Sequence, residues 1–424
     1  MPDPNVLITP KNIAALALPI LGSRLNVAKN LSHAMDKEYG RPPNKKPGDT
    51  VQVRKPYRFV GGYGLDWDPE PLVDQVCPIT VNQVPHVHFQ WDSVQKTLSL
   101  REAMRIYVDP VVETLASKIN AGAATWAANN ALNSVGTPGT KPTGPLTYLT
   151  AGDVLVELGL PEGRTSNLTC VVNRAMSSAY VNGTQSLLNP SGLISKQIMS
   201  GEMQNSLGYE ILLDQTINQH VNGTFGGTPL ANSATAQQAE GGNNAEMDFI
   251  TDGWTSGGTS LKLGDKFTIG SATSATVGGV ESVHPQTRIS TGRQQVFTVM
   301  SDISDTTGAI TMRIAPAITP SGQYQNVNSA AVDNAIITMI GTSGGTATQG
   351  LLFDQNAFAF VSVPINEPEP GMGAKITNYT DDETGLTISH VAYFNGDTGQ
   401  ERHKFQCLIG YGNLYREMAC VIQA

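Results

Sequence analysis

The chain has 424 residues, enough for two or three domains with hydrophobic cores, and a net charge of −9. Its longest apolar stretch, residues 13–21, is too short to span a bilayer, and no basic segment precedes it. We therefore expect neither a membrane helix nor a signal peptide, and a protein that is made and used in a cytosol. The many Gly and Pro residues favour a β-rich protein with many turns.

The first 58 residues are basic, although the whole chain is acidic. Ten Lys or Arg residues and four acidic residues leave +6 on residues 1–58, and therefore −15 on the rest. A positive arm on a negative body favours head-to-tail contact between copies of the chain, or contact with a polyanion. The pattern predicts a helix over 10–30 and an extended arm over the Pro- and Lys-rich residues 40–48.

A hairpin with a long loop follows the arm. Residues 50–60 predict one strand, residues 72–84 predict its partner, and the polar and aromatic residues 61–71 predict the tip of the loop. Apolar residues also alternate over 80–91, which predicts a strand there. Its apolar face would carry Val81, Pro85, Val87, Phe89 and Trp91.

A long helix is the next predicted element. Residues 99–102 have the form of a capping box that opens a short helix, and Asp109 with Pro110 is a suitable start for a second one. From there, apolar residues recur at helical spacing to about Leu132. This predicts a helix about 33 Å long, which is suited to be the spine of a domain.

The middle of the chain alternates between helices and strands before its composition changes. The expected elements are helices at 151–158 and 174–180 and strands at 168–172 and 209–213. Residues 223–345 then form short strands rich in Gly, Ser, Thr and Val, which indicates a β module inserted into a larger α+β body. Residues 351–363 and 386–421 return to the character of that body and predict further strands.

No arrangement typical of an active site stands out. His86 and His88 would point the same way from a strand, but no third ligand stands at a suitable spacing, so we expect a polar strand face rather than a metal site. Ser343 lies in a match to G-x-S-x-G, a motif that needs a helix after it, whereas residues 346–350 resemble a linker. The four cysteines form no C-x-x-C pair, and no disulfide is expected.

The loop over 49–80 carries the residues that we expect to contact neighbouring copies of the chain. They are Arg54, Lys55, Arg58, Tyr63, Asp66, Trp67, Asp68 and Glu70. The acidic residues could instead bind a divalent cation, and the aromatic and basic residues could bind single-stranded nucleic acid. Contact with another subunit accounts for both sets without any ligand, metal or cofactor.

Several short motifs follow one another in the second half of the chain. They are GDKFTI at 264–269, VFTVM at 296–300, ITMRIAP at 310–316, YQNVN at 324–328, FDQNAFAFVSVP at 353–364, and LIGYG at 408–412 followed by Arg416 and Glu417. With the order of elements above, they resemble the major capsid (coat) proteins of tailed bacteriophages. The resemblance is to the short-tailed Salmonella-phage type, which carries an inserted β domain, and it covers nearly the whole chain.

The resemblance implies an α+β protein with the tailed-phage capsid fold and an inserted antiparallel β-barrel-like domain. The implied parts are an N-terminal arm (1–48), an extended loop (49–80), a peripheral domain with the spine helix (81–150 and 381–424), an axial domain (151–222 and 346–380) and the inserted domain (223–345). Residues 251–260 depart from the family, because they are short and carry one charge where the family has a long charged loop that bridges capsomers.

The resemblance also implies a structural function without catalysis, that of a major capsid protein forming hexamers and pentamers in an icosahedral phage head. The implied partners are other copies, scaffolding protein, portal protein, packaged double-stranded DNA bound without specificity and a possible decoration protein, with no membrane. The implied location is the virion, after assembly in the bacterial cytoplasm. Two other hypotheses stay open, a phage tail or adhesin-like β-rich binding protein and a hydrolase that uses Ser343.

Overall fold

The computed structural model describes residues 25–33, 50–61, 64, 69–92, 109–161, 168–184, 207–276, 278–365, 374–380, 386–395 and 400–424. The chain divides into two compact units. The first comprises Met1–Gln52, Pro78–Ala123 and Ala359–Gly412, and the second comprises Val53–Cys77, Ala124–Phe358 and Asn413–Ala424. Both units combine strands with part of one long helix, so the fold is of the mixed α+β class.

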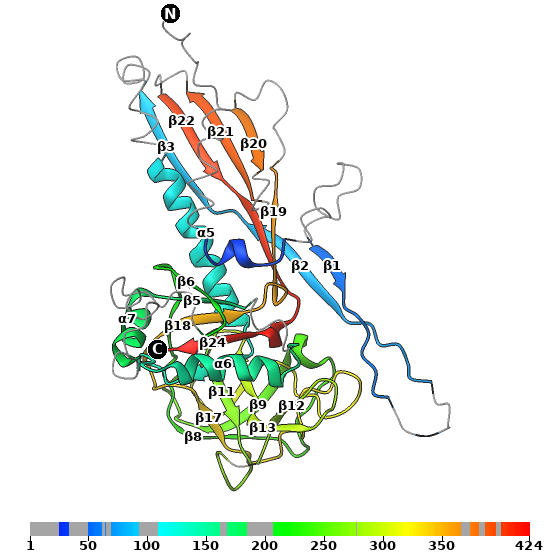
Figure 1. Cartoon of the computed structure of the whole chain (residues 1–424). Coiled ribbons are helices and arrows are strands. Elements are labelled where there is room, and N and C mark those ends of the chain that lie inside the picture. Colours follow the sequence, from blue (N-terminus) through cyan, green and yellow to red (C-terminus); the bar gives the residue numbers. More distant parts are fainter. Residues whose placement is uncertain are drawn as a thin grey trace, which may run out of the picture. The chain divides into compact units, whose positions relative to one another are not determined.

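The first unit is built on two four-stranded sheets. In one, the order is β20 (Ala374–Thr380), β21 (Thr387–Asn395), β22 (Gln400–Gln406) and β3 (His86–Asp92), and every neighbouring pair is antiparallel. In the other, the order is β1 (Thr50–Arg54), β2 (Val76–Gln83), β23 (Leu408–Asn413) and β19 (Phe358–Val363) (Figure 1). A short 3-10 helix, η1 (Ala28–Asn30), is tied to this unit, because the Val27 N–H donates to Asn120 Oδ1 at 2.8 Å.

The prediction of one strand over 80–91 is wrong. The segment contains the end of β2 and most of β3, which belong to different sheets and are separated by Val84 and Pro85. Proline has no N–H and cannot donate to a strand ladder. Its carbonyl accepts from the Cys407 N–H at 3.1 Å, so Pro85 sits at the point where the chain leaves one sheet for the other.

The predicted spine helix is present as α5 (Asp109–Asn130), which starts in the first unit and ends in the second. In its N-terminal half, Val112, Leu115 and Ile119 are buried, as the helical spacing predicts. Its C-terminal half buries alanines together with Asn120 and Asn130 and no large apolar side chain, which allows other segments to approach closely. The capping box at 99–102 lies outside the described residues. Among the helices that are described, none has the length and apolar character that a membrane crossing needs.

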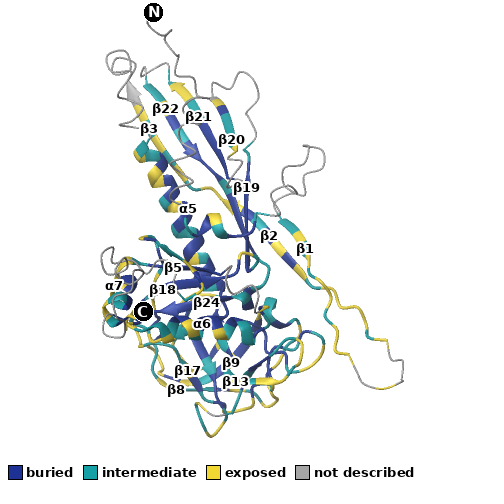
Figure 2. Ribbon diagram, viewed as in Figure 1, coloured by how far each residue is buried: buried dark blue, intermediate teal, exposed yellow. Residues whose placement is uncertain are grey.

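A mixed sheet forms the framework of the second unit. Its strand order is β4 (Asn133–Gly136), β24 (Ala419–Gln423), β18 (Thr346–Phe353), β5 (Thr169–Val172) and β6 (Glu210–Leu213), with β7 (Gln219–Val221) paired to the start of β18. The outer pairs, β4–β24 and β5–β6, are parallel. Figure 2 shows β18 and β24 in the buried colour, and α6 (Pro145–Glu157) packs on β24 and β4. Helix α7 (Arg174–Thr184) follows β5, as predicted.

The inserted segment forms a nearly closed barrel. The strand order is β17 (Ile337–Met339), β11 (Lys266–Ile269), β14 (Val296–Val299), β16 (Ile310–Ala315), β9 (Met247–Trp254) and β8 (Gly227–Ala231), and a bridge between Leu230 and Ile336 joins the two ends. Two smaller pairs accompany it, β10 (Thr259–Leu261) with β15 (Ile303–Asp305) and β12 (Glu281–Val283) with β13 (Ser290–Gln294). Closing a sheet in this way removes the exposed edges that would otherwise pair with other chains.

The barrel has a hydrophobic core of its own. Its buried aromatic residues Phe249, Phe267 and Phe297 stack in a row, with ring centroids 5.7–6.3 Å apart. All buried members of this core lie between Ala231 and Ile337. The residues between β9 and β10 form only a tight turn at 255–258. The boundaries of the five predicted domains stay a prediction.

Candidate assembly surface

The loop between β1 and β2 is the part of the second unit in which the sequence places contacts with other subunits. Its arms begin as neighbours in a sheet, and the Lys55 N–H donates to the Gln75 carbonyl at 2.9 Å. Beyond this pair, residues 56–61 and 69–75 have no regular secondary structure, and Figure 1 shows them as a long excursion from the two strands. Such a loop needs side-chain contacts to keep one conformation.

Large apolar side chains on this loop face solvent. Phe59 is 56% exposed and Leu72 is 66% exposed, and Tyr57, Val60 and Val73 are exposed as well. Figure 2 shows the exposed colour along both arms. Single exposed apolar residues are ordinary, but several of them on one loop mark an interaction surface.

Two of the predicted contact residues, Lys55 and Arg58, bind the C-terminal segment of their own chain. Arg58 Nη2 lies 3.0 Å from Oε1 of Glu417, whose side chain is buried. Lys55 Nζ lies 4.4 Å from the centre of the Tyr415 ring, a cation–π contact, and burial lowers the pKa of Lys55. Arg54 is exposed. The base of the loop is therefore fastened to its own subunit, a role that sequence reasoning missed.

Glu70 holds the two arms of the loop together. Its carboxylate accepts from the Val60 N–H at 2.7 Å and from the Gly61 N–H at 2.6 Å, and these backbone donors lower its pKa. Gln323 of the barrel donates to the same carboxylate at 3.4 Å. Within its own chain Glu70 thus binds both arms of the loop, and its predicted contact with a neighbouring subunit stays a prediction.

The barrel supports the loop through further hydrogen bonds to backbone carbonyls. These run from Arg288 Nη2 to Phe59 (3.2 Å), from Gln323 Nε2 to Pro71 (2.6 Å) and from Tyr324 Oη to Val73 (2.8 Å). A cavity of about 570 Å³ lies beside these contacts, between residues 73–75 of the loop and residues 238–241 and 319–324 of the barrel. The sequence could not indicate these hydrogen bonds, because each donor lies more than 200 residues from its acceptor in the chain.

The remaining predicted contact residues, Tyr63, Asp66, Trp67 and Asp68, lie outside the described residues, so their role stays a prediction. In the part of the chain that is described, no three potential metal-ligating side chains gather at one place.

The other candidate sites lack the geometry of a catalytic or metal centre. His86 and His88 are exposed on β3 with their rings stacked 6.1 Å apart, which fits the expected polar strand face. Ser343 lies in the turn between β17 and β18, and its hydroxyl accepts from the Phe225 N–H at 2.9 Å. The linker expected at 346–350 is in fact the start of β18, so the serine sits between two strands.

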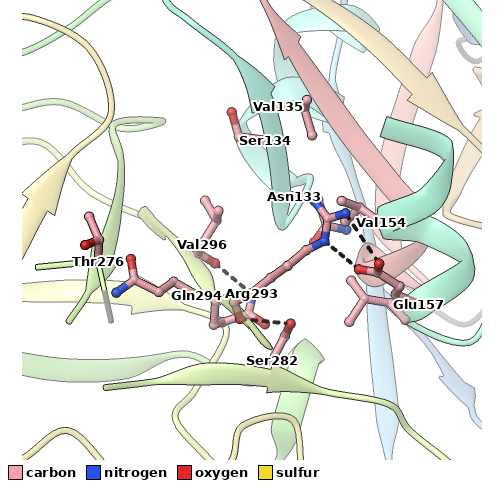
Figure 3. Close-up of a pocket in the computed structure, with 12 residues that line it drawn as sticks. Asn133, Ser134, Val135, Val154, Glu157, Thr276, Ser282, Arg293, Gln294 and Val296 are labelled. Atoms are coloured by element: carbon pink, nitrogen blue, oxygen red, sulfur yellow. Dashed lines mark hydrogen bonds and ion pairs between the residues drawn. The ribbon is translucent and has the colours of Figure 1, made fainter. Parts of the chain in front are cut away.

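A second cavity, of about 300 Å³, lies where the barrel meets the mixed sheet. Figure 3 shows its lining, with Arg293 from β13 reaching Glu157 at the end of α6. Arg293 Nε and Glu157 Oε2 are 2.6 Å apart, and Ser282 and Gln294 add polar groups to the wall. The ion pair between Arg293 and Glu157 leaves no net charge on this wall. We therefore interpret the cavity as a polar contact between the barrel and the neighbouring helix and sheet.

The mixed sheet, the long helix, the inserted barrel and the loop with exposed apolar side chains fit the structural, shell-forming class of protein that the motifs predicted. The family model of the P22 coat protein, gene protein 5, matches residues 33–422. The chain therefore belongs to the P22 coat protein family, as the motifs predicted. It is a phage major capsid protein, located in the shell of the virion, where it associates with other copies to form the icosahedral head.

The chain is also similar to solved structures, at low sequence identity. The chain is similar to a protein of Mycobacterium phage Che8, with 10% identity over 93% of this chain and 90% of that one and a TM-score of 0.46. The capsid protein of cyanophage P-SCSP1u has 11% identity over 88% and 83% of the two chains, with a TM-score of 0.41. A virus-like particle from Pyrococcus furiosus has 8% identity over 97% and 98%, with a TM-score of 0.37. No curated protein matches the chain.

Proposed function

We propose that the chain builds its head from hexamers and pentamers that are held together in part by the loop between β1 and β2. One observation carries the proposal, the set of exposed apolar side chains on a loop that is fastened at its base and braced by the barrel. A loop already held in one conformation loses little entropy when it binds. Contact with a neighbouring subunit would remove its apolar side chains from water.

Charge supports contacts that repeat from subunit to subunit. Residues 1–58 carry +6 and the rest of the chain carries −15, so the basic segment of one copy suits the acidic body of the next. Individual exposed ion pairs contribute only about 0–1 kcal/mol. The apolar contacts therefore determine the strength of the interface, and the charges determine its register. The basic segment also suits non-specific contact with packaged double-stranded DNA.

The proposal extends to the partners that such a head needs. Assembly would take place in the bacterial cytoplasm on a scaffolding protein, with a portal protein at one vertex and a possible decoration protein outside. The protein would have no catalytic role, since the described candidates lack the geometry of an active site.

The test replaces an apolar residue on the loop and compares shells with free subunits. Leu72→Ser should lower the temperature at which assembled particles disrupt, and leave the melting temperature of the free subunit nearly unchanged, because Leu72 is exposed in the subunit. Leu146→Ser, at a leucine 74% exposed on α6, is the matched control. Particle disruption is followed by light scattering and electron microscopy. Equal losses in particle and subunit would show that the loop belongs to the core of its own subunit.

A further inference from the structure

The C-terminal end of α5 is closed by side chains from distant parts of the second unit. The last carbonyls of a helix have no partner within the helix, and here the chain runs straight on into β4 without a glycine cap. The Asn130 carbonyl instead accepts from Arg416 Nε at 3.0 Å. The carbonyl of Ala131, the next residue, accepts from Lys266 Nζ at 2.6 Å. One donor thus comes from the C-terminal segment and the other from the barrel.

Burial and a second hydrogen bond hold the Lys266 side chain in this position. Its side chain is buried at 2% exposure, and its second hydrogen bond goes to Thr298 Oγ1 at 3.0 Å, on the neighbouring strand β14. A buried lysine is costly unless its ammonium group finds acceptors. A cation near the carbonyl end of a helix is also favoured by the helix dipole. The side chain therefore has a reason to lie between the barrel and the helix end.

The two residues before Lys266 bring the same turn against the helix. Gly264 has a φ of +98°, and a Cβ placed on it would lie 2.4 Å from Asn129 Oδ1 in the last turn of α5. Asp265 is buried, and its carboxylate lies 2.7 Å from His220 Nε2 and accepts from the Gly223 N–H at 3.1 Å. This turn, residues 264–266, thus contacts both the helix end and the segment through which the chain enters the barrel.

We propose that Lys266 is a positioning residue through which the inserted barrel caps the C-terminal end of α5. The turn at 264–266 sets the barrel against the helix, and the Lys266 amine donates to the carbonyl of Ala131, the residue that follows the last one of the helix. Arg416 completes the cap from the other side, and its neighbour Glu417 binds Arg58 at the base of the loop. The helix end is therefore the point at which barrel, helix and loop support one another.

Hydrogen–deuterium exchange on the unassembled full-length subunit tests this directly. Lys266→Met keeps the apolar stem and removes the donor, so amides of residues 124–132 should exchange up to roughly tenfold faster, the factor expected for losing one hydrogen bond. Strands β14 and β16 should keep their protection, because the hydrogen bonds of their ladder and the hydrophobic core of the barrel do not involve the Lys266 amine. Lys262→Met, at an exposed lysine near the same turn, is the matched control and should change nothing.

Two outcomes would overturn the proposal. One is unchanged exchange at 124–132 in Lys266→Met, and the other is an equal increase at 124–132 and throughout the barrel. If Lys266→Met does not fold, the proposal is tested by measuring hydrogen exchange of the wild-type subunit at increasing denaturant concentrations. Residues 124–132 and 264–299 should then lose protection in one step, and separate steps would refute the cap. Shell assembly is not needed for either measurement, so this result is independent of the proposed function.

Discussion

At the scale of residues, charged side chains with little exposure hold the second unit together at one place. Lys266, Arg416 and Glu417 are each at most 2% exposed, although lysine, arginine and glutamate are almost never buried without a partner. Burial lowers the pKa of Arg416 to about 10, so its guanidinium stays charged at neutral pH. Its contacts with Asn130 and the helix end explain why a charge is tolerated there.

The protonation of Lys266 makes stability depend on pH. Burial lowers its pKa to about 7, with nearby Arg416 lowering it further and Cys420 opposing the shift. Between pH 7 and about 10.4 the unfolded state binds the proton and the folded state does not, so stability should rise with pH in that window. The unfolding free energy of wild type minus that of Lys266→Met should rise by up to about 1.4 kcal/mol per pH unit. Urea titrations of both proteins at pH 7, 8 and 9 measure this difference in unfolding free energy. A difference that does not change with pH would contradict the lowered pKa of Lys266.

The Arg58–Glu417 pair should contribute measurably to subunit stability. In Arg58→Met the buried Glu417 carboxylate loses its charged partner, and an unfolding free energy lower by about 1–3 kcal/mol is expected. Arg54→Met, at an exposed arginine four residues earlier, should change it by less than about 0.5 kcal/mol. Urea unfolding followed by circular dichroism gives both values. Similar losses in the two variants would mean that Arg58 acts through general charge rather than through Glu417.

At the scale of elements, local patterns predicted the type of an element better than its partners. Helices α5 and α7 and strands β5 and β6 begin within one residue of the predicted start, whereas α6 begins at Pro145, six residues before the start predicted for it. The strand over 80–91 and the linker over 346–350 were wrong. Pro85 ends one ladder despite continuing apolar alternation, and the start of β18 is ordered by pairing with β7, more than 120 residues earlier. Neither the end of the ladder at Pro85 nor the pairing of β18 with β7 can be inferred from a few consecutive residues.

The barrel should fold when it is excised. Its core lies within 231–337, and bridging of β8 with β17 leaves it nearly closed, so a fragment of residues 223–345 should give a β-type circular dichroism spectrum and melt cooperatively. Phe267→Ala in the same fragment should abolish or strongly lower that melt, because the side chain is fully buried between two other aromatic rings. A random-coil spectrum of the unsubstituted fragment would show that the barrel depends on the host.

At the scale of the whole molecule, an assembling protein has to be stable alone and still keep surface for its neighbours. The second unit meets both needs with one set of contacts. Arg58, Glu70 and the barrel residues Arg288 and Tyr324 fix the loop by polar contacts, while its apolar side chains stay exposed. Polar contacts within the subunit thus leave apolar area exposed, which suits the contacts between subunits that we propose.

The sequence by itself determined the family, helices α5 and α7, strands β5 and β6, and the strand-rich module within residues 223–345. Composition, periodicity and short motifs are local properties, and they are readable without knowing which segments meet. Only the tertiary structure decided that Glu70 braces its own loop and that Lys266 and Arg416 close the end of α5. These contacts join residues up to 286 positions apart, and the free energy of burying such a charge depends on partners that folding alone brings together.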